Sequence, residues 1–254
     1  MTVSQDVATT IFVAVFAAIA SPRATMQKIE DYPPPFPRSG TIKLRDTARF
    51  TAWDVLREKG KPSPLYKLDM DQVSVTMTEG AVRITSADDS ISIDNSRIGT
   101  VTFESKDTIR REEGLSDVPS RTIVVQLKSA PPDNVPIVLR GPGLLPRRDA
   151  FKLFETERIC VWEQTWLPNR PFTNCGGYLE VASVFITGGK LRRRSLGSAT
   201  DETGSQVFEQ YVGLSSSQDP GGPDYPNAPI TFPYEEEWVS GEPRAIWIEF
   251  KYGK

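Results

Sequence analysis

An internal repeat is the feature that most restricts what this chain can fold into. Residues 49–54 read RFTAWD and residues 158–163 read RICVWE, an offset of 109 positions. Residues 121–128 read RTIVVQLK and residues 244–251 read RAIWIEFK, an offset of 123 positions. Self-similarity of this kind indicates two copies of one structural unit. Because 123 exceeds 109 by 14, the second copy carries fourteen extra residues, and we expect them in the loop at 213–229.

Alternating apolar and polar residues predict short β-strands in each copy. Residues 72–78, QVSVTMT, alternate as a half-buried strand does. The chain also contains 21 Pro and 18 Gly, which favours frequent turns over long helices. Chain breakers crowd residues 130–143, so we expect a boundary between two all-β units there. Trp53 and Trp162 occupy matching repeat positions and are predicted to lie in the cores.

Histidine is absent from the chain, and this absence restricts its chemistry. Imidazole is the commonest protein ligand for transition metals and the usual general base near neutral pH. A Ser-His-Asp triad and a histidine metal site are therefore excluded. The only cysteines, Cys160 and Cys175, form one disulfide if the chain is exported or remain two free thiols. The net charge of −3 provides no basic field, so nucleic acid is not an expected partner.

The N-terminal segment is apolar and uncharged from residue 7 to residue 22, VATTIFVAVFAAIASP. A helix of this length is short for the ~30 Å core of a bilayer. It ends in an A-x-A-like sequence, as a signal peptide does. However, it lacks the Lys or Arg that precedes the apolar region of a signal peptide. Three interpretations stay open: a signal or tether with an exported body, a tether with a cytoplasmic body, and a helix packed on protein. Residues 31–38, DYPPPFPR, follow as a stiff spacer or as an arm along a partner.

The opening and closing segments of the repeat resemble those of a known family. Residues 153–163 read LFETERICVWE and residues 236–251 read EEWVSGEPRAIWIEFK. They are similar to bacterial cupin-domain proteins whose repeats open with "(L)FEN-(D/E)RVRVW" and close with "EELVSG-x-PRAI-x-x-ELK". The resemblance covers residues 37–128, in a more divergent copy, and 147–252. It implies a double cupin, or bicupin: two tandem antiparallel jelly-roll barrels. The expected domains are an apolar, proline-rich arm at 1–36, barrel 1 at 37–130, a linker at 131–147 and barrel 2 at 148–254.

The resemblance also locates the positions where metal-binding cupins carry a His-x-His pair, an acidic ligand and a third His. In this chain none of these positions holds histidine, which implies a degenerate member with no metal and no cofactor. The former ligand positions, which we expect to line a pocket in each barrel, are Tyr66, Leu68, Asp71 and Arg111 in the first copy and Cys175, Gly177, Glu180 and Tyr234 in the second.

Three functions from different classes remain open. The first is a non-catalytic, metal-free accessory subunit attached to a membrane-bound protein complex, for example of respiratory or photosynthetic type, on the periplasmic or exported side. The second is a small-molecule binding module that uses the vacated pockets, and the third is a metal-independent isomerase or epimerase. For the first function, the residues expected to mediate attachment are Ile11, Phe12, Val13, Val15, Phe16, Ile19, Tyr32 and Phe36.

Overall fold

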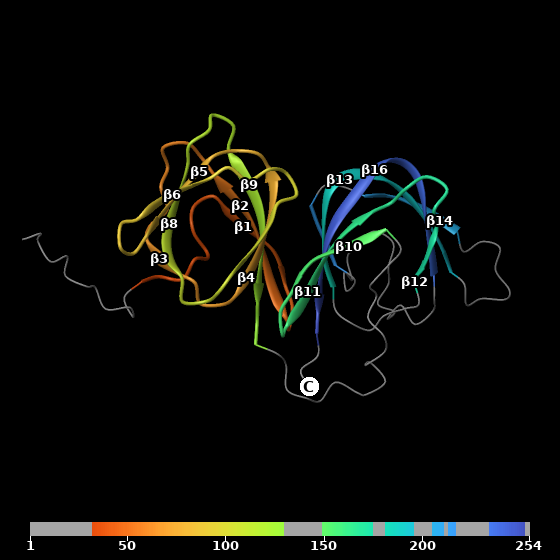
Figure 1. Cartoon of the computed structure of the whole chain (residues 1–254), viewed down its shortest axis with the longest axis horizontal. Coiled ribbons are helices and arrows are strands. Elements are labelled where there is room, and N and C mark those ends of the chain that lie inside the picture. The colour runs from red at the N-terminus through yellow and green to blue at the C-terminus, as the bar shows by residue number, and fades with distance from the viewer. Residues whose placement is uncertain are drawn as a thin grey trace, which may run out of the picture. The chain divides into compact units, whose positions relative to one another are not determined.

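The computed structural model describes residues 32–129, 149–174, 181–195, 205–210, 213–216 and 234–251 (Figure 1). These residues contain no helix, and the predicted all-β class is confirmed. The strands of the first half are β1 (Thr41–Asp46), β2 (Phe50–Arg57), β3 (Tyr66–Lys67), β4 (Gln72–Thr78), β5 (Val82–Ser86), β6 (Ile91–Asp94), β7 (Val101–Glu104), β8 (Ile109–Gly114) and β9 (Ser120–Leu127). Those of the second half are β10 (Ala150–Glu155), β11 (Ile159–Thr165), β12 (Phe172–Asn174), β13 (Val181–Ser195), β14 (Ser205–Gln210), β15 (Gly213–Ser216) and β16 (Tyr234–Phe250).

The two halves share one strand order, although the second uses fewer and longer strands. In the first half, β1-β2-β9-β4-β7 form one antiparallel sheet and β3-β8-β5-β6 form another. In the second half, β10-β11-β16-β13-β14 form a single sheet, with β12 on β16 and β15 on β13. The long strand β13 runs through the places of β4 and β5, and β16 runs through those of β8 and β9. We call β1–β9 barrel 1 and β10–β16 barrel 2.

Strand register confirms the two repeat offsets. Lys43 pairs with Trp53 and Lys152 pairs with Trp162, and each pair is followed by a bulge at the same point. Gln72 of β4 pairs with Gln126 of β9, while Val181 of β13 pairs with Glu249 of β16. Between the two halves, the residue number increases by 109 from Gln72 to Val181 and by 123 from Gln126 to Glu249.

The fourteen extra residues enter barrel 2 at two places, so the prediction of a single loop at 213–229 is wrong. Val75 pairs with Val101 in barrel 1, and Val184 pairs with Leu214 in barrel 2. The offset between the equivalent residues Val75 and Val184 is 109, whereas the offset between the equivalent residues Val101 and Leu214 is 113. Four residues are therefore added before β15, and the other ten between β15 and the end of β16. Residues 213–216 belong to a strand because they pair with β13.

The largest hydrophobic cluster joins the two barrels. It contains eight buried residues from each half, and every member is the repeat equivalent of a member in the other half. From barrel 1 these are Phe50, Ala52, Val73, Val75, Met77, Ile123, Val125 and Leu127; from barrel 2 they are Ile159, Val161, Ala182, Val184, Ile186, Ile246, Ile248 and Phe250. Phe50 stacks on Phe250 with ring centroids 5.3 Å apart. One sheet face of each barrel thus packs against the other barrel in a pseudo-symmetric core.

Strand β4 is buried on both faces, which corrects the prediction of a half-buried strand. Its apolar residues, such as Val73 and Val75, belong to the core between the barrels. Its polar residues are also buried: Gln72 is 2% exposed and Thr76 is 8% exposed. The polar set faces the inside of barrel 1, because the apolar face is used for contact between the barrels.

Two arginines bridge the ends of this shared core. Arg49 donates from Nη1 to the carbonyl oxygen of Lys251 at 3.0 Å. Its repeat equivalent Arg158 donates from Nη2 to the carbonyl oxygens of Leu127, at 3.0 Å, and Lys128. A cavity of about 70 Å³ lies between these chain ends. Each guanidinium therefore binds the last residues of the closing strand in the opposite barrel.

The N-terminal boundary differs from the predicted one. Residues Tyr32–Lys254 form one compact unit, so residues 32–36 group with the body rather than with a separate arm. Phe36 is 8% exposed and stacks on Trp53, so its side chain is covered by barrel 1 and its assignment to partner attachment is wrong. Tyr32 is half-buried.

The other residues expected to mediate attachment, Ile11 to Ile19, and the expected linker at 131–147 lie outside the described residues. None of the described residues forms a helix long and apolar enough to cross a bilayer.

We predict that Leu127→Ala lowers the free energy of unfolding by about 2–5 kcal/mol, because it leaves a cavity in the shared core. Urea denaturation measures the change, and Ile91→Ala, at a side chain that is 64% exposed, is the control with an expected effect within about 0.5 kcal/mol. Both barrels should unfold in one transition, and two separate transitions would contradict a shared core.

Candidate functional site

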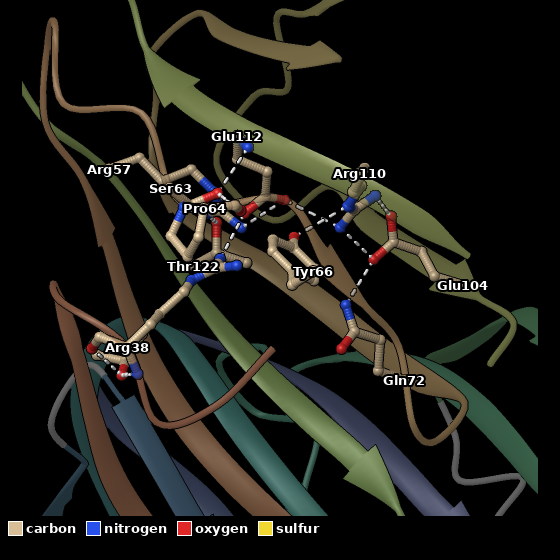
Figure 2. A network of polar contacts seen from close by, with 11 residues as sticks. Arg38, Arg57, Ser63, Pro64, Tyr66, Gln72, Glu104, Arg110, Glu112 and Thr122 are labelled. Atoms are coloured by element: carbon tan, nitrogen blue, oxygen red, sulfur yellow. Dashed lines mark hydrogen bonds and ion pairs between the residues drawn. The ribbon is translucent and has the colours of Figure 1, made fainter. Parts of the chain in front are cut away.

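A buried network of charged side chains fills the inside of barrel 1 (Figure 2). At its centre is Glu112 on β8, whose side chain is 3% exposed. Arg57, at the end of β2, donates from Nε to Glu112 Oε2 at 2.9 Å and from Nη2 to Oε1 at 3.2 Å. Arg38, which precedes β1, donates from Nη2 to Oε2 at 2.6 Å. Arg110 lies 2.9 Å from Oε1 through its Nη2. Three guanidinium groups therefore surround one carboxylate.

The network continues from Arg110 toward the other sheet of barrel 1. Arg110 binds both carboxylate oxygens of Glu104 on β7, with Nη2 2.7 Å from Oε2. Gln72 donates from Nε2 to the same Oε2 at 2.7 Å, and Arg110 donates from Nε to the Tyr66 hydroxyl at 3.1 Å. The guanidinium carbon of Arg38 lies 4.3 Å from the centroid of the Tyr66 ring. Buried charges are tolerated when they are paired and hydrogen-bonded in this way.

The charges in this network fix one another's protonation states. Burial alone would raise the pKa of Glu112, but Arg57, Arg110 and Arg38 together outweigh it and hold the pKa well below the ordinary value. Burial would lower the pKa of Arg110, and Glu112, Tyr66 and Glu104 raise it well above the ordinary value. Burial raises the pKa of Tyr66. The glutamate is thus ionised, the arginine is protonated and the tyrosine is neutral at pH 7.

Barrel 2 is filled by aromatic rings instead. Trp166 stacks on Phe185 with centroids 5.6 Å apart and lies 6.4 Å from Trp247. Two carboxylates are buried among the described residues of barrel 2. Glu236 is 2% exposed and accepts hydrogen bonds from Trp166 Nε1 at 3.1 Å and Arg193 Nη2 at 2.6 Å. Glu249 is 5% exposed and lies on the same face of β16 as Trp247. At the 109 and 123 offsets, apolar residues replace the polar ones of barrel 1: Trp166 for Arg57, Phe172 for Ser63, Val181 for Gln72 and Ala245 for Thr122.

The structure brings together only some of the residues that were expected to line the pocket of barrel 1. Tyr66 and Leu68 are both buried, at 1% and 0% exposed, and Tyr66 belongs to the charged network. Arg111 is exposed, so its predicted place in the pocket is wrong. Asp71 accepts a hydrogen bond from Arg158 Nη1 at 3.3 Å and lies at the contact between the barrels. Of the second set, Cys175, Gly177 and Glu180 lie outside the described residues, as does the side chain of Tyr234.

Strand alternation explains why Arg110 and Glu112, rather than Arg111, point inward. Successive side chains of β8 project to opposite faces, and its exposure pattern alternates between buried and less buried residues. The sequence IRREEG at 109–114 indicates such a buried ion pair, because alternation places an arginine and a glutamate on the same face of the strand, whichever face is buried. The roles of Arg38 and Arg57 leave no such signal, because their partner lies 74 and 55 residues away.

Comparison with solved structures identifies the fold. The protein Ylba from E. coli matches with a TM-score of 0.53 and 8% identity, over 83% of this chain and 82% of Ylba. The oxalate decarboxylase from Lactobacillus farciminis, solved as its formate complex, matches with a TM-score of 0.51 and 12% identity, over 84% of this chain and 81% of the enzyme. The chain has the bicupin fold. No family model and no curated protein matches its sequence.

The interior of barrel 1 does not fit the metal ion that the resemblance associates with the fold. The chain has no histidine, and the two carboxylates inside barrel 1, Glu104 and Glu112, are already bound by guanidinium groups. Three arginines would also repel a divalent cation. Among the described residues, no three His, Cys, Asp or Glu side chains come together as a ligand set.

We predict that Glu112→Gln lowers the free energy of unfolding by about 3–5 kcal/mol, because removal of one partner leaves buried charges uncompensated. Glu113→Gln is the matched control, since Glu113 is the next residue along β8 and pairs with the 43% exposed Arg83. Its expected effect is below about 1 kcal/mol. Equal losses in the two variants would contradict the proposed importance of the network.

Acidification provides an independent test of the same carboxylate. A carboxyl group whose pKa is lower in the folded state than in the unfolded state stabilises the fold at pH values above its unfolded pKa, which is 4.5 for Glu112. This stability is lost as the pH falls toward the pKa of the folded state. We expect the stability of the wild-type chain to decrease below pH 4.5 more steeply than that of Glu112→Gln. Urea midpoints between pH 3 and 7 measure the difference, and parallel pH profiles would argue against an ionised Glu112.

Proposed function

We propose that this bicupin is a metal-free, non-catalytic protein that acts as an accessory subunit of a larger assembly. The observation that carries the proposal is that side chains of the chain itself occupy the inside of both barrels. A salt-bridge network occupies barrel 1, and among the described residues aromatic rings with the buried glutamates Glu236 and Glu249 occupy barrel 2. A binding module or enzyme of this fold needs an open interior with polar groups that converge on a ligand.

The protonation states in barrel 1 support a non-catalytic role. A general acid or base works best when its pKa lies near the operating pH. The neighbouring arginines hold the pKa of Glu112 far below neutrality, and burial raises the pKa of Tyr66 above its ordinary value near 10. Neither group exchanges a proton readily at pH 7. This counts against the isomerase or epimerase alternative in barrel 1.

The N-terminal segment supports attachment to a membrane-bound partner, and the proposal places this attachment on the periplasmic or exported side. Residues 7–22 are uncharged and apolar, which makes even partial burial on lipid or protein favourable at ~25 cal/mol per Å². Since the body begins at Tyr32, attachment is assigned to residues before it. The small-molecule alternative keeps one source of support, the described Glu236 with its aromatic surroundings in barrel 2.

We predict that the purified chain binds no transition metal stoichiometrically, before or after incubation with excess Mn(II) or Zn(II) and gel filtration. The reason is the donor set, in which no histidine is available and the carboxylates of barrel 1 are paired. Elemental analysis of Fe, Mn, Ni, Cu and Zn per chain is the measurement. A content near one metal per chain would refute the metal-free assignment.

We also predict that the native chain fractionates with membranes and that deletion of residues 1–22 releases a folded body. The deletion removes the apolar segment but leaves every described residue in place. Membrane fractionation and circular dichroism measure the two effects. A mature chain that begins near Ser21 would eliminate the anchor, and a truncated chain that stays with the membranes would move the attachment surface to the barrels.

A further inference from the structure

Residues Pro33–Arg38, which we call the strap, pack on barrel 1 without belonging to any of its sheets. The first strand begins only at Thr41. The strap is held at three points in sequence order: the carbonyl oxygen of Pro33 accepts a hydrogen bond from the amide of Lys67 at 3.0 Å, the ring of Phe36 stacks on Trp53 at 4.9 Å, and Arg38 enters the charged network.

Each contact point of the strap has a matching group on barrel 1. Phe36 joins Trp53, Val55 and Val124 in a small hydrophobic cluster of its own. Arg38 has a side chain that is 8% exposed, lies over the Tyr66 ring and is 2.6 Å from Glu112. Barrel 1 therefore presents the ring of Trp53 and the carboxylate of Glu112, which together fit a segment with an aromatic residue two positions before an arginine.

The docked strap also carries an unfavourable feature. Nη1 of Arg38 is buried and has no hydrogen-bond partner. An unsatisfied buried donor is unfavourable, which offsets part of the gain from the ion pair. Opening the strap would return this group to water. Trp53, Lys67 and Glu112 would lose their contacts with the strap, while the nine strands of barrel 1 would keep the contacts they make with one another and with the core between the barrels.

We propose that the surface of barrel 1 formed by Trp53, Tyr66, Lys67 and Glu112 is a binding site for an extended aromatic-x-arginine peptide segment, occupied in cis by the strap. The strap opens locally while the barrels stay folded, and the open site accepts the same segment in trans. The strap directly follows residues 1–31, so a partner bound to those residues would change how readily the strap opens. This coupling rests on the proposed function, whereas the binding site does not.

Hydrogen exchange of the wild-type, full-length chain tests local opening. The amide of Lys67 reports on the strap because its acceptor is Pro33, and the amides paired between β2 and β9 report on the barrel. We expect the Lys67 amide to exchange at least 100-fold faster than the slowest β2–β9 amides. Equal rates would mean that the strap opens only when the barrel unfolds, which would overturn the proposal.

A peptide in trans tests the binding site. In full-length Arg38→Gln the strap loses its ion pair, and a synthetic peptide of residues 32–41 should bind this variant at least ten-fold more tightly than the same peptide with the Arg38→Gln change. The wild-type chain should bind neither peptide measurably, because its own strap competes at a high effective concentration. Equal binding of both peptides to the variant, or no binding, would overturn the proposal. If the variant fails to fold, the exchange experiment on the wild-type chain decides. Neither the exchange experiment nor the peptide experiment depends on membrane attachment. Failure of this proposal can therefore be distinguished from failure of the proposed function.

Discussion

The apolar contact between the two barrels is the interaction on which the rest of the structure depends. Its sixteen residues form eight repeat pairs, and none of them lies in a loop. Full burial of a side chain such as Leu127 or Phe250 contributes about 1.5–3 kcal/mol relative to leaving it exposed. Because each barrel supplies only half of this core, neither half is expected to be a stable domain without the other.

A shared core between the barrels leaves their interiors free to diverge. Stability does not require an apolar interior in barrel 1, because its strands already bury their apolar face against barrel 2. Barrel 1 therefore accommodates Arg57 and Gln72 where barrel 2 has Trp166 and Val181. Two halves with the same strand register thus contain a salt-bridge network in one case and packed aromatic rings in the other.

The sequence was sufficient for the fold and insufficient for the site, for physical reasons. Repeat offsets depend on strand pairing, which is regular, and the offsets of 109 and 123 reappear in the register. The family motif predicts Arg111 in the pocket, but the motif does not indicate which face of β8 this residue occupies. The proline-rich sequence of residues 31–38 predicts a spacer or an arm, whereas Phe36 is buried through its contact with Trp53. Such contacts between distant segments leave no local pattern.

The charged network gives barrel 1 a different kind of specificity from a hydrophobic core. Buried ion pairs add little net stability compared with apolar side chains of similar volume, but loss of one partner is strongly unfavourable. Around Glu112, Arg38 comes from the strap, Arg57 from β2 and Arg110 from β8, so this carboxylate is fully paired only when all three segments are in place. The carboxylate of Glu112 therefore links closure of the N-terminal segment to the register of the barrel. That link allows the polar interior of barrel 1 to specify one arrangement of the chain.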